Sequence, residues 1–113
     1  MSLITRDDLN VAKETLTIEF AQKQASAKAM VTKRDHERKQ VRAQLIRASN
    51  DKSADQRESQ ALCHPDYVAA CERESEAIKA FEYYRKRSDD ARAIMDFARS
   101  EMASDRRAVE GLR

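Results

Sequence analysis

The sequence predicts an all-α protein built from two long helices. The 113 residues include one glycine and one proline, which is too few for many short strands joined by tight turns. Alanine, the strongest helix former, occurs 18 times, and charged residues make up 37% of the chain. Apolar and small residues recur at the helical spacing on both sides of one polar stretch near the middle of the chain.

The first predicted helix runs from about Arg6 to about Ser49. Thr5, with the acidic Asp8 three residues later, is typical of the residue that caps a helix N-terminus. Small and apolar residues then recur with a period near 3.6, and no glycine or proline interrupts them. The sequence therefore predicts one unbroken helix here.

A polar connection over about residues 50–64 follows. Within it, residues 53–63 are weakly patterned and fit either a short helix or a loop. Pro65 marks the sharpest boundary, because proline suits the first turn of a helix and disfavours a helical conformation in the residue before it. The second helix is predicted from about Pro65 to about Glu110, where Gly111 provides a natural end.

The second predicted helix carries a long apolar stripe. Its members are Val68, Cys71, Ile78, Phe81, Tyr84, Ala91, Ile94, Met95, Ala98, Met102 and Val109. Two helices of similar length with a short connection predict a single domain, residues 1–113, folded as an antiparallel coiled-coil hairpin. One stripe per helix buries little apolar surface, so we expect the hairpin to form a homodimer with the architecture of a four-helix bundle.

Charges suggest a register for the hairpin. Folding the chain at its middle sets basic residues of the first helix opposite acidic residues of the second. Arg34 and Arg38 fall at positions that face the partner helix, where a charged group needs a carboxylate or an exit to water. The predicted register brings Glu76 close to Arg38, and we predict that this pair fixes the alignment of the helices.

Two basic clusters are the candidate contact sites. The first contains Lys33, Arg34, Arg38, Lys39 and Arg42, and the second contains Arg85, Lys86 and Arg87, preceded by Tyr83 and Tyr84. Arginine binds phosphate oxygens in pairs, and tyrosine can stack on bases, so nucleic acid is a possible partner. The alternative is internal pairing with nearby acidic residues, over 72–76 for the first cluster and 89–90 for the second, and the sequence favours it.

The sequence gives little support for a catalytic site or a metal site. Cys63, His64 and Cys71 lack a fourth ligand and the usual spacing of a structural zinc site. No glycine-rich phosphate loop or nucleophile elbow occurs in the sequence. We therefore expect no enzymatic activity, no cofactor and no bound metal. With no apolar run of membrane-spanning length, we also expect no membrane partner and a cytoplasmic location.

Part of the sequence resembles a protein group. The stretch from His64 to Ala70, and the later Tyr83-Tyr84-Arg85-Lys86-Arg87, are similar to a pattern in small helical-hairpin accessory proteins of phages and prophages. That resemblance covers the second predicted helix and implies an accessory role, in phage DNA metabolism or host takeover, without catalytic residues. From the sequence we thus expect an interaction protein with an unidentified protein partner, and a nucleic-acid-binding accessory protein is the alternative.

Overall fold

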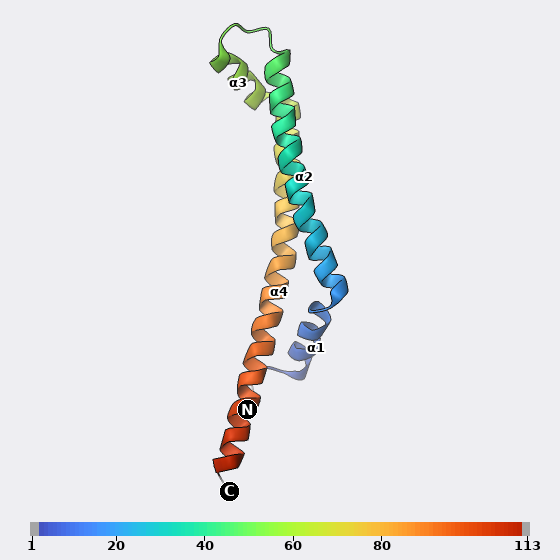
Figure 1. Cartoon of the computed structure of the whole chain (residues 1–113), viewed down its shortest axis with the longest axis vertical. Coiled ribbons are helices and arrows are strands. Elements are labelled where there is room, and N and C mark those ends of the chain that lie inside the picture. The colour runs from blue at the N-terminus through green and yellow to red at the C-terminus, as the bar shows by residue number, and fades with distance from the viewer. Residues whose placement is uncertain (1–2, 112–113) are drawn as a thin grey trace. The chain divides into compact units, whose positions relative to one another are not determined.

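The structure, a computed structural model, describes residues 3–111, and every regular element in this range is an α-helix (Figure 1). The helices are α1 (Arg6–Thr15), α2 (Ile18–Ala48), α3 (Ala54–Cys63) and α4 (Pro65–Gly111). The predicted all-α class is therefore confirmed. The chain divides into two compact units: unit 1 joins Met1–Lys23 to Tyr83–Arg113, and unit 2 is Gln24–Glu82.

The start of α1 follows the sequence signal. The Thr5 hydroxyl accepts a hydrogen bond from the backbone N–H of Asp8 at 3.1 Å, and the Asp8 carboxylate accepts one from the backbone N–H of Thr5 at 3.0 Å. These two bonds form a reciprocal capping box. They also lower the pKa of Asp8, through the backbone hydrogen bond from Thr5 first and the side-chain hydrogen bond second.

The prediction of one helix over residues 6–49 is wrong, because the chain leaves the helical conformation at Leu16 (φ −85°, ψ 42°). The Thr15 hydroxyl donates to a backbone carbonyl one turn earlier at 2.8 Å, a local bond that competes with the helix. The Thr17 hydroxyl then accepts from the backbone N–H of Phe20 at 3.2 Å, which caps the start of α2. Two threonines around Leu16 therefore end one helix and begin the next.

The polar connection contains a helix, α3, which the sequence left undecided. The Ser53 hydroxyl accepts from the N–H of Gln56 at 3.5 Å and provides the N-cap. After α3 ends, His64 is extended (φ −68°, ψ 137°), as expected for a residue before proline. Helix α4 begins at Pro65, at the predicted boundary.

Within unit 2, α2 and the first part of α4 run in opposite directions, with α3 beside them (Figure 1). Buried and half-buried positions in α2 and α4 recur in alternating steps of three and four residues. They include Ala27, Val31, Arg34, Arg38, Val41 and Leu45 in α2, and Tyr67, Ala70, Glu74, Ala77 and Phe81 in α4. This spacing keeps one face of each helix against its neighbour over several turns.

The apolar stripe predicted for α4 is wrong in its first half and at its end, where Met102 and Val109 are 58% and 54% exposed. Val68 and Ile78 are 45% and 42% exposed, whereas Ala70 and Ala77 are buried. The reason is steric and electrostatic: the two alanines permit close approach of another helix, and Glu74 between them meets an arginine of α2. As a result, a second apolar stripe of α4 is left on the surface of unit 2.

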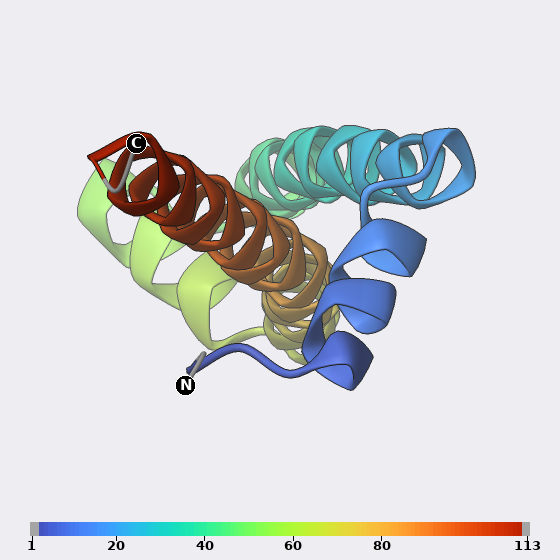
Figure 2. The same cartoon turned by 90° about the horizontal axis from the view of Figure 1, so that it is seen from below.

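In unit 1, α1 lies beside α4 in both views (Figures 1 and 2). Small side chains are buried here, Ala12 and Thr15 in α1 and Ser88 and Ala91 in α4. The rings of Phe20 and Tyr84 meet edge to face, with centroids 5.3 Å apart.

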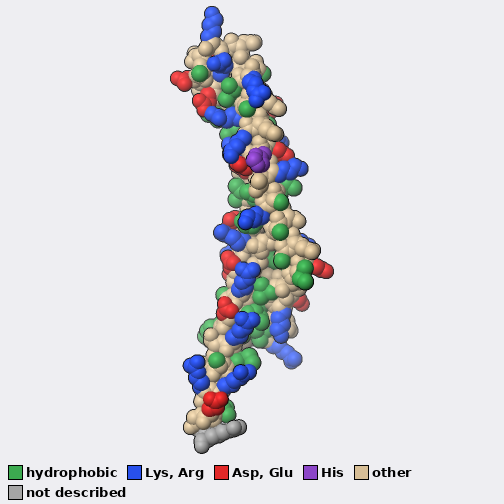
Figure 3. All heavy atoms as spheres, viewed as in Figure 1, with side chains coloured by type: hydrophobic (Ala, Val, Ile, Leu, Met, Phe, Trp, Pro, Cys, Tyr) green, Lys and Arg blue, Asp and Glu red, His purple; other side chains and the backbone are tan. Residues whose placement is uncertain are grey.

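The core is made of small residues. Among the described residues, the buried apolar ones are all alanines, and no large side chain is fully buried. On the face seen in Figure 3, hydrophobic side chains are interspersed with charged ones. Large apolar side chains such as Leu62, Val68 and Ile78 thus remain exposed.

Candidate interaction surfaces

The first basic cluster is largely paired with carboxylates of unit 2. Arg34 contacts Glu37 at 2.7 Å, and Lys39 contacts Asp35 at 3.0 Å. Arg42 pairs with Glu58 of α3, and Lys33 is exposed. This arrangement favours internal pairing for most of the cluster, although the expected partners in 72–76 serve only one of its members.

Arg38 is the most connected member of the cluster. Its guanidinium donates to both carboxylate oxygens of Glu74 at 3.2 Å, to Asp35 at 2.9 Å and to the Tyr67 hydroxyl at 3.5 Å. The hydrogen bond to Tyr67, followed by those to Glu74 and Asp35, raises the pKa of Arg38 above its ordinary value. The side chain therefore remains a cation at the contact between α2 and α4.

Glu74 replaces the predicted partner Glu76. The register expectation placed Glu76 opposite Arg38, but the bonded carboxylate lies half a turn earlier on α4, and Glu76 is exposed. Arg38 pairs with Glu74 rather than Glu76 for the same reason that Val68 and Ile78 are exposed. The face of α4 that carries Ala70 and Ala77 is the one that approaches α2.

Basic residues of the first cluster lower the pKa values of two acidic residues of α2. The hydrogen bond from Lys39 is the main cause that lowers the pKa of Asp35, and Arg38 adds to it. In the same way, Arg34 lowers the pKa of Glu37, mainly through its side-chain hydrogen bond. Both carboxylates are thereby held in their charged form.

The second basic cluster lies in unit 1. Arg85, Lys86 and Arg87 are exposed, but consecutive residues fan around a helix and do not share one face. Arg87 donates to the Tyr83 hydroxyl at 2.9 Å, and its guanidinium carbon lies 5.6 Å from the centre of that ring. Tyr83 also contacts the ring of Tyr84. The aromatic group expected to stack on bases is thus engaged within the protein.

The cysteines and histidine near the start of α4 form no common centre. Cys63 is exposed, Cys71 is half-buried, and both are free thiols. The Nδ1 atom of His64 accepts from the backbone N–H of Asp66 at 3.0 Å. Across the part of the chain that the structure describes, no group of three His, Cys, Asp or Glu residues is placed to hold a metal ion.

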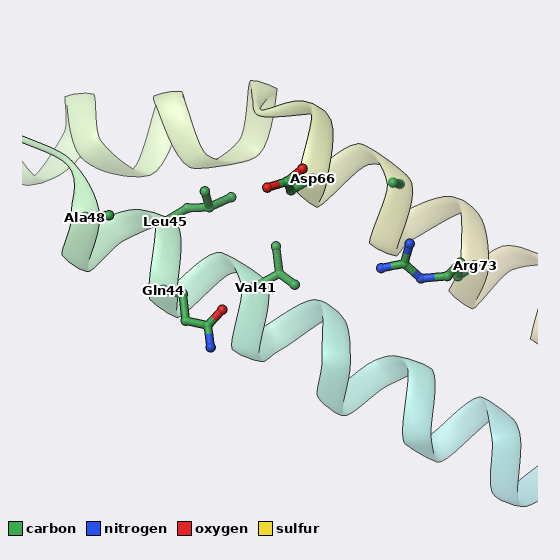
Figure 4. A pocket seen from close by; sticks show the side chains of 7 residues that line it. Val41, Gln44, Leu45, Ala48, Asp66 and Arg73 are labelled. Carbon is green, nitrogen blue, oxygen red and sulfur yellow. The ribbon is translucent and has the colours of Figure 1, made fainter.

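A groove lies between the end of α2 and the start of α4 (Figure 4). Val41 and Leu45 of α2 point toward α4, and the charged side chains of Asp66 and Arg73 flank the groove. The two apolar residues are already half-buried. We name this the α2–α4 groove.

A second groove lies on the other apolar stripe of α4, where α3 joins it. Its lining residues are Leu62, Tyr67, Val68, Cys71, Glu72, Ser75, Glu76 and Lys79. Leu62 and Val68 are 44% and 45% exposed, and Ile78 continues the same stripe. We name this surface the α3–α4 face. Sequence periodicity assigned Val68, Cys71 and Ile78 to the interior. Counting the three-and-four steps from Tyr67 would have separated the two stripes.

Comparison of the chain with protein-family models, with curated proteins and with solved structures gives no match. None of the helices in residues 3–111 combines the length and the apolar character needed to cross a membrane.

Proposed function

We propose that this protein is a non-enzymatic interaction protein, an antiparallel coiled-coil hairpin that pairs as a homodimer and acts through the surfaces of its helices. The observation that carries the proposal is the contrast between a core of alanines and the large apolar side chains left on the outside. Apolar area removed from water stabilises a fold by roughly 25 cal/mol per Å². Association with a second copy would supply burial that the single chain lacks.

Sedimentation equilibrium at micromolar concentration tests the homodimer. The expected result is twice the mass of the chain, with unchanged helical circular dichroism on dilution into the monomer range. A stable single-chain mass at every concentration would contradict the proposal.

Nucleic-acid binding is the rival function, and the exposed Arg85 and Lys86 are the observation in its favour. Phosphate contacts release counterions, so such binding falls steeply as salt rises. Fluorescence anisotropy with a labelled single-stranded oligonucleotide over a salt series separates the two functions. The interaction proposal expects no salt-dependent binding, whereas steep dependence that disappears in the R85S/K86S variant would establish the rival.

A further inference from the structure

We propose that the two copies of the homodimer join through the α3–α4 face, with the α4 helices antiparallel across a twofold axis near Ser75. The inference rests on the proposed homodimer and names its interface. Three features of the face carry it: exposed apolar side chains, an order of side-chain sizes that suits an antiparallel contact, and self-complementary charge.

Exposed apolar side chains are concentrated on this face of unit 2. Leu62, Val68 and Ile78 are each more than 40% exposed. By contrast, Val41 and Leu45 in the α2–α4 groove are already half-buried. A second copy therefore removes more apolar surface from water on the α3–α4 face than in the other groove.

The order of side-chain sizes along the stripe suits an antiparallel contact between two copies. Val68 and Ile78 are bulky and lie at its ends, and the small Cys71 and Ser75 lie between them. These four residues follow one another in the three-and-four steps that keep a single helix face in contact with a partner. With the axis near Ser75, Ile78 of each copy lies opposite the space between Cys71 and Ser75 of the other, so a bulky side chain meets small ones.

Charged residues beside the stripe favour an antiparallel arrangement of the two α4 helices. Glu72 and Lys79 are both exposed and lie two helical turns apart along the same side of α4. An axis near Ser75 sets Glu72 of each copy near Lys79 of the other, which gives two ion pairs per dimer. In a parallel twofold pair the two copies of Glu72 lie on opposite sides of the contact, and so do the two copies of Lys79, so neither ion pair forms.

The test reverses the charges of Glu72 and Lys79 and measures the dimer dissociation constant by sedimentation equilibrium. The variants E72K and K79E each turn two attractions into two repulsions, so each should raise the dimer dissociation constant by about tenfold. The double variant E72K/K79E restores both pairs in reverse and should return the constant to near the wild-type value. Circular dichroism of each variant checks that the helices are retained.

Local helix effects cannot imitate this pattern. Lys at position 72 would attract Glu76 one turn away, whereas Glu at position 79 would repel it. A purely local cause would thus move the two single variants in opposite directions. Weakening in both, with rescue in the double variant, requires contact between copies.

The α2–α4 groove provides the matched control, because Asp66 and Arg73 also form an acid–base pair two turns apart. The variants D66K and R73D should leave the dimer constant unchanged. Loss and rescue in this second pair alone would overturn the proposed interface while leaving the homodimer intact, and so would a dimer insensitive to both exchanges. A wild-type chain that is monomeric throughout would instead remove the proposed function and the interface together.

Discussion

Arg38 occupies a position where two packed helices would ordinarily hold an apolar residue. It is accommodated because Glu74, Asp35 and the Tyr67 hydroxyl together satisfy its guanidinium. The sequence was sufficient to place Arg34 and Arg38 at the helix contact, since helical spacing alone determines that. It was insufficient to choose between Glu74 and Glu76, because both lie on nearby parts of α4 and only the close approach at Ala70 and Ala77 separates them.

A double-mutant cycle tests the observed pair. Arg38→Met and Glu74→Gln should show a coupling free energy of up to about 1 kcal/mol in thermal melts, because the pair is half-buried and still partly hydrated. The matched cycle with Glu76→Gln in place of Glu74→Gln should be additive. Coupling to Glu76 rather than Glu74 would restore the register predicted from sequence.

The carboxylate of Asp35 allows a prediction about pH. Its folded-state pKa is lowered, chiefly by Lys39. The associated stabilisation is therefore present above the unfolded-state pKa and is lost as the pH falls through the folded-state pKa. Lys39→Met should raise the pKa of Asp35 toward its ordinary value in a carbon-detected NMR titration, whereas Lys33→Met should leave it unchanged. An Asp35 pKa indifferent to Lys39 would show that the contact does not persist in solution.

At the scale of elements, the break at Leu16 is the feature that periodicity could not reveal. Apolar spacing continues through the break, so a count of hydrophobic positions sees one helix. The signal was local: threonines at 15 and 17 offer side-chain bonds to the backbone, and these decide the helix ends. By contrast, the start of α4 was predictable because Pro65 restricts its own backbone and that of its neighbour.

Proline scanning tests the break. Ile18→Pro should change the free energy of unfolding by less than about 1 kcal/mol, because proline is favoured at the first position of a helix. Lys28→Pro, in the interior of α2, should cost about 3 kcal/mol or more. Similar large losses for both variants in urea melts would mean that α1 and α2 are one continuous helix.

At the scale of the whole molecule, the fold class followed from composition, because one glycine and one proline leave few ways to turn the chain. The distribution of burial did not follow, since alanine counts as apolar in any pattern yet fills little volume. Large side chains on α4 were therefore expected inside, and the structure leaves several of them outside. Sequence periodicity therefore did not identify the surface through which we propose that the protein associates.

Association should appear in the thermal stability. If the native state is a homodimer, mass action raises the midpoint of unfolding as the protein concentration rises. The wild-type chain should show this increase in melts followed by circular dichroism, and the E72K variant should show it only at higher concentrations. A midpoint independent of concentration in the wild-type chain would indicate a monomeric native state.

The alanines between α2 and α4 also affect how uniquely the alignment of α4 along α2 is fixed. An alanine has no rotamers to freeze, so its burial costs no side-chain entropy, but it also gives the helix surface little relief. Ala70 and Ala77 lie two turns apart on the same face, so a slip of α4 by that distance would exchange one for the other. At these two positions the side chains do not distinguish the two alignments, so the other residues of the face must do so. Arg38 and Glu74 contribute to that choice, because their ion pair forms in only one of the two alignments.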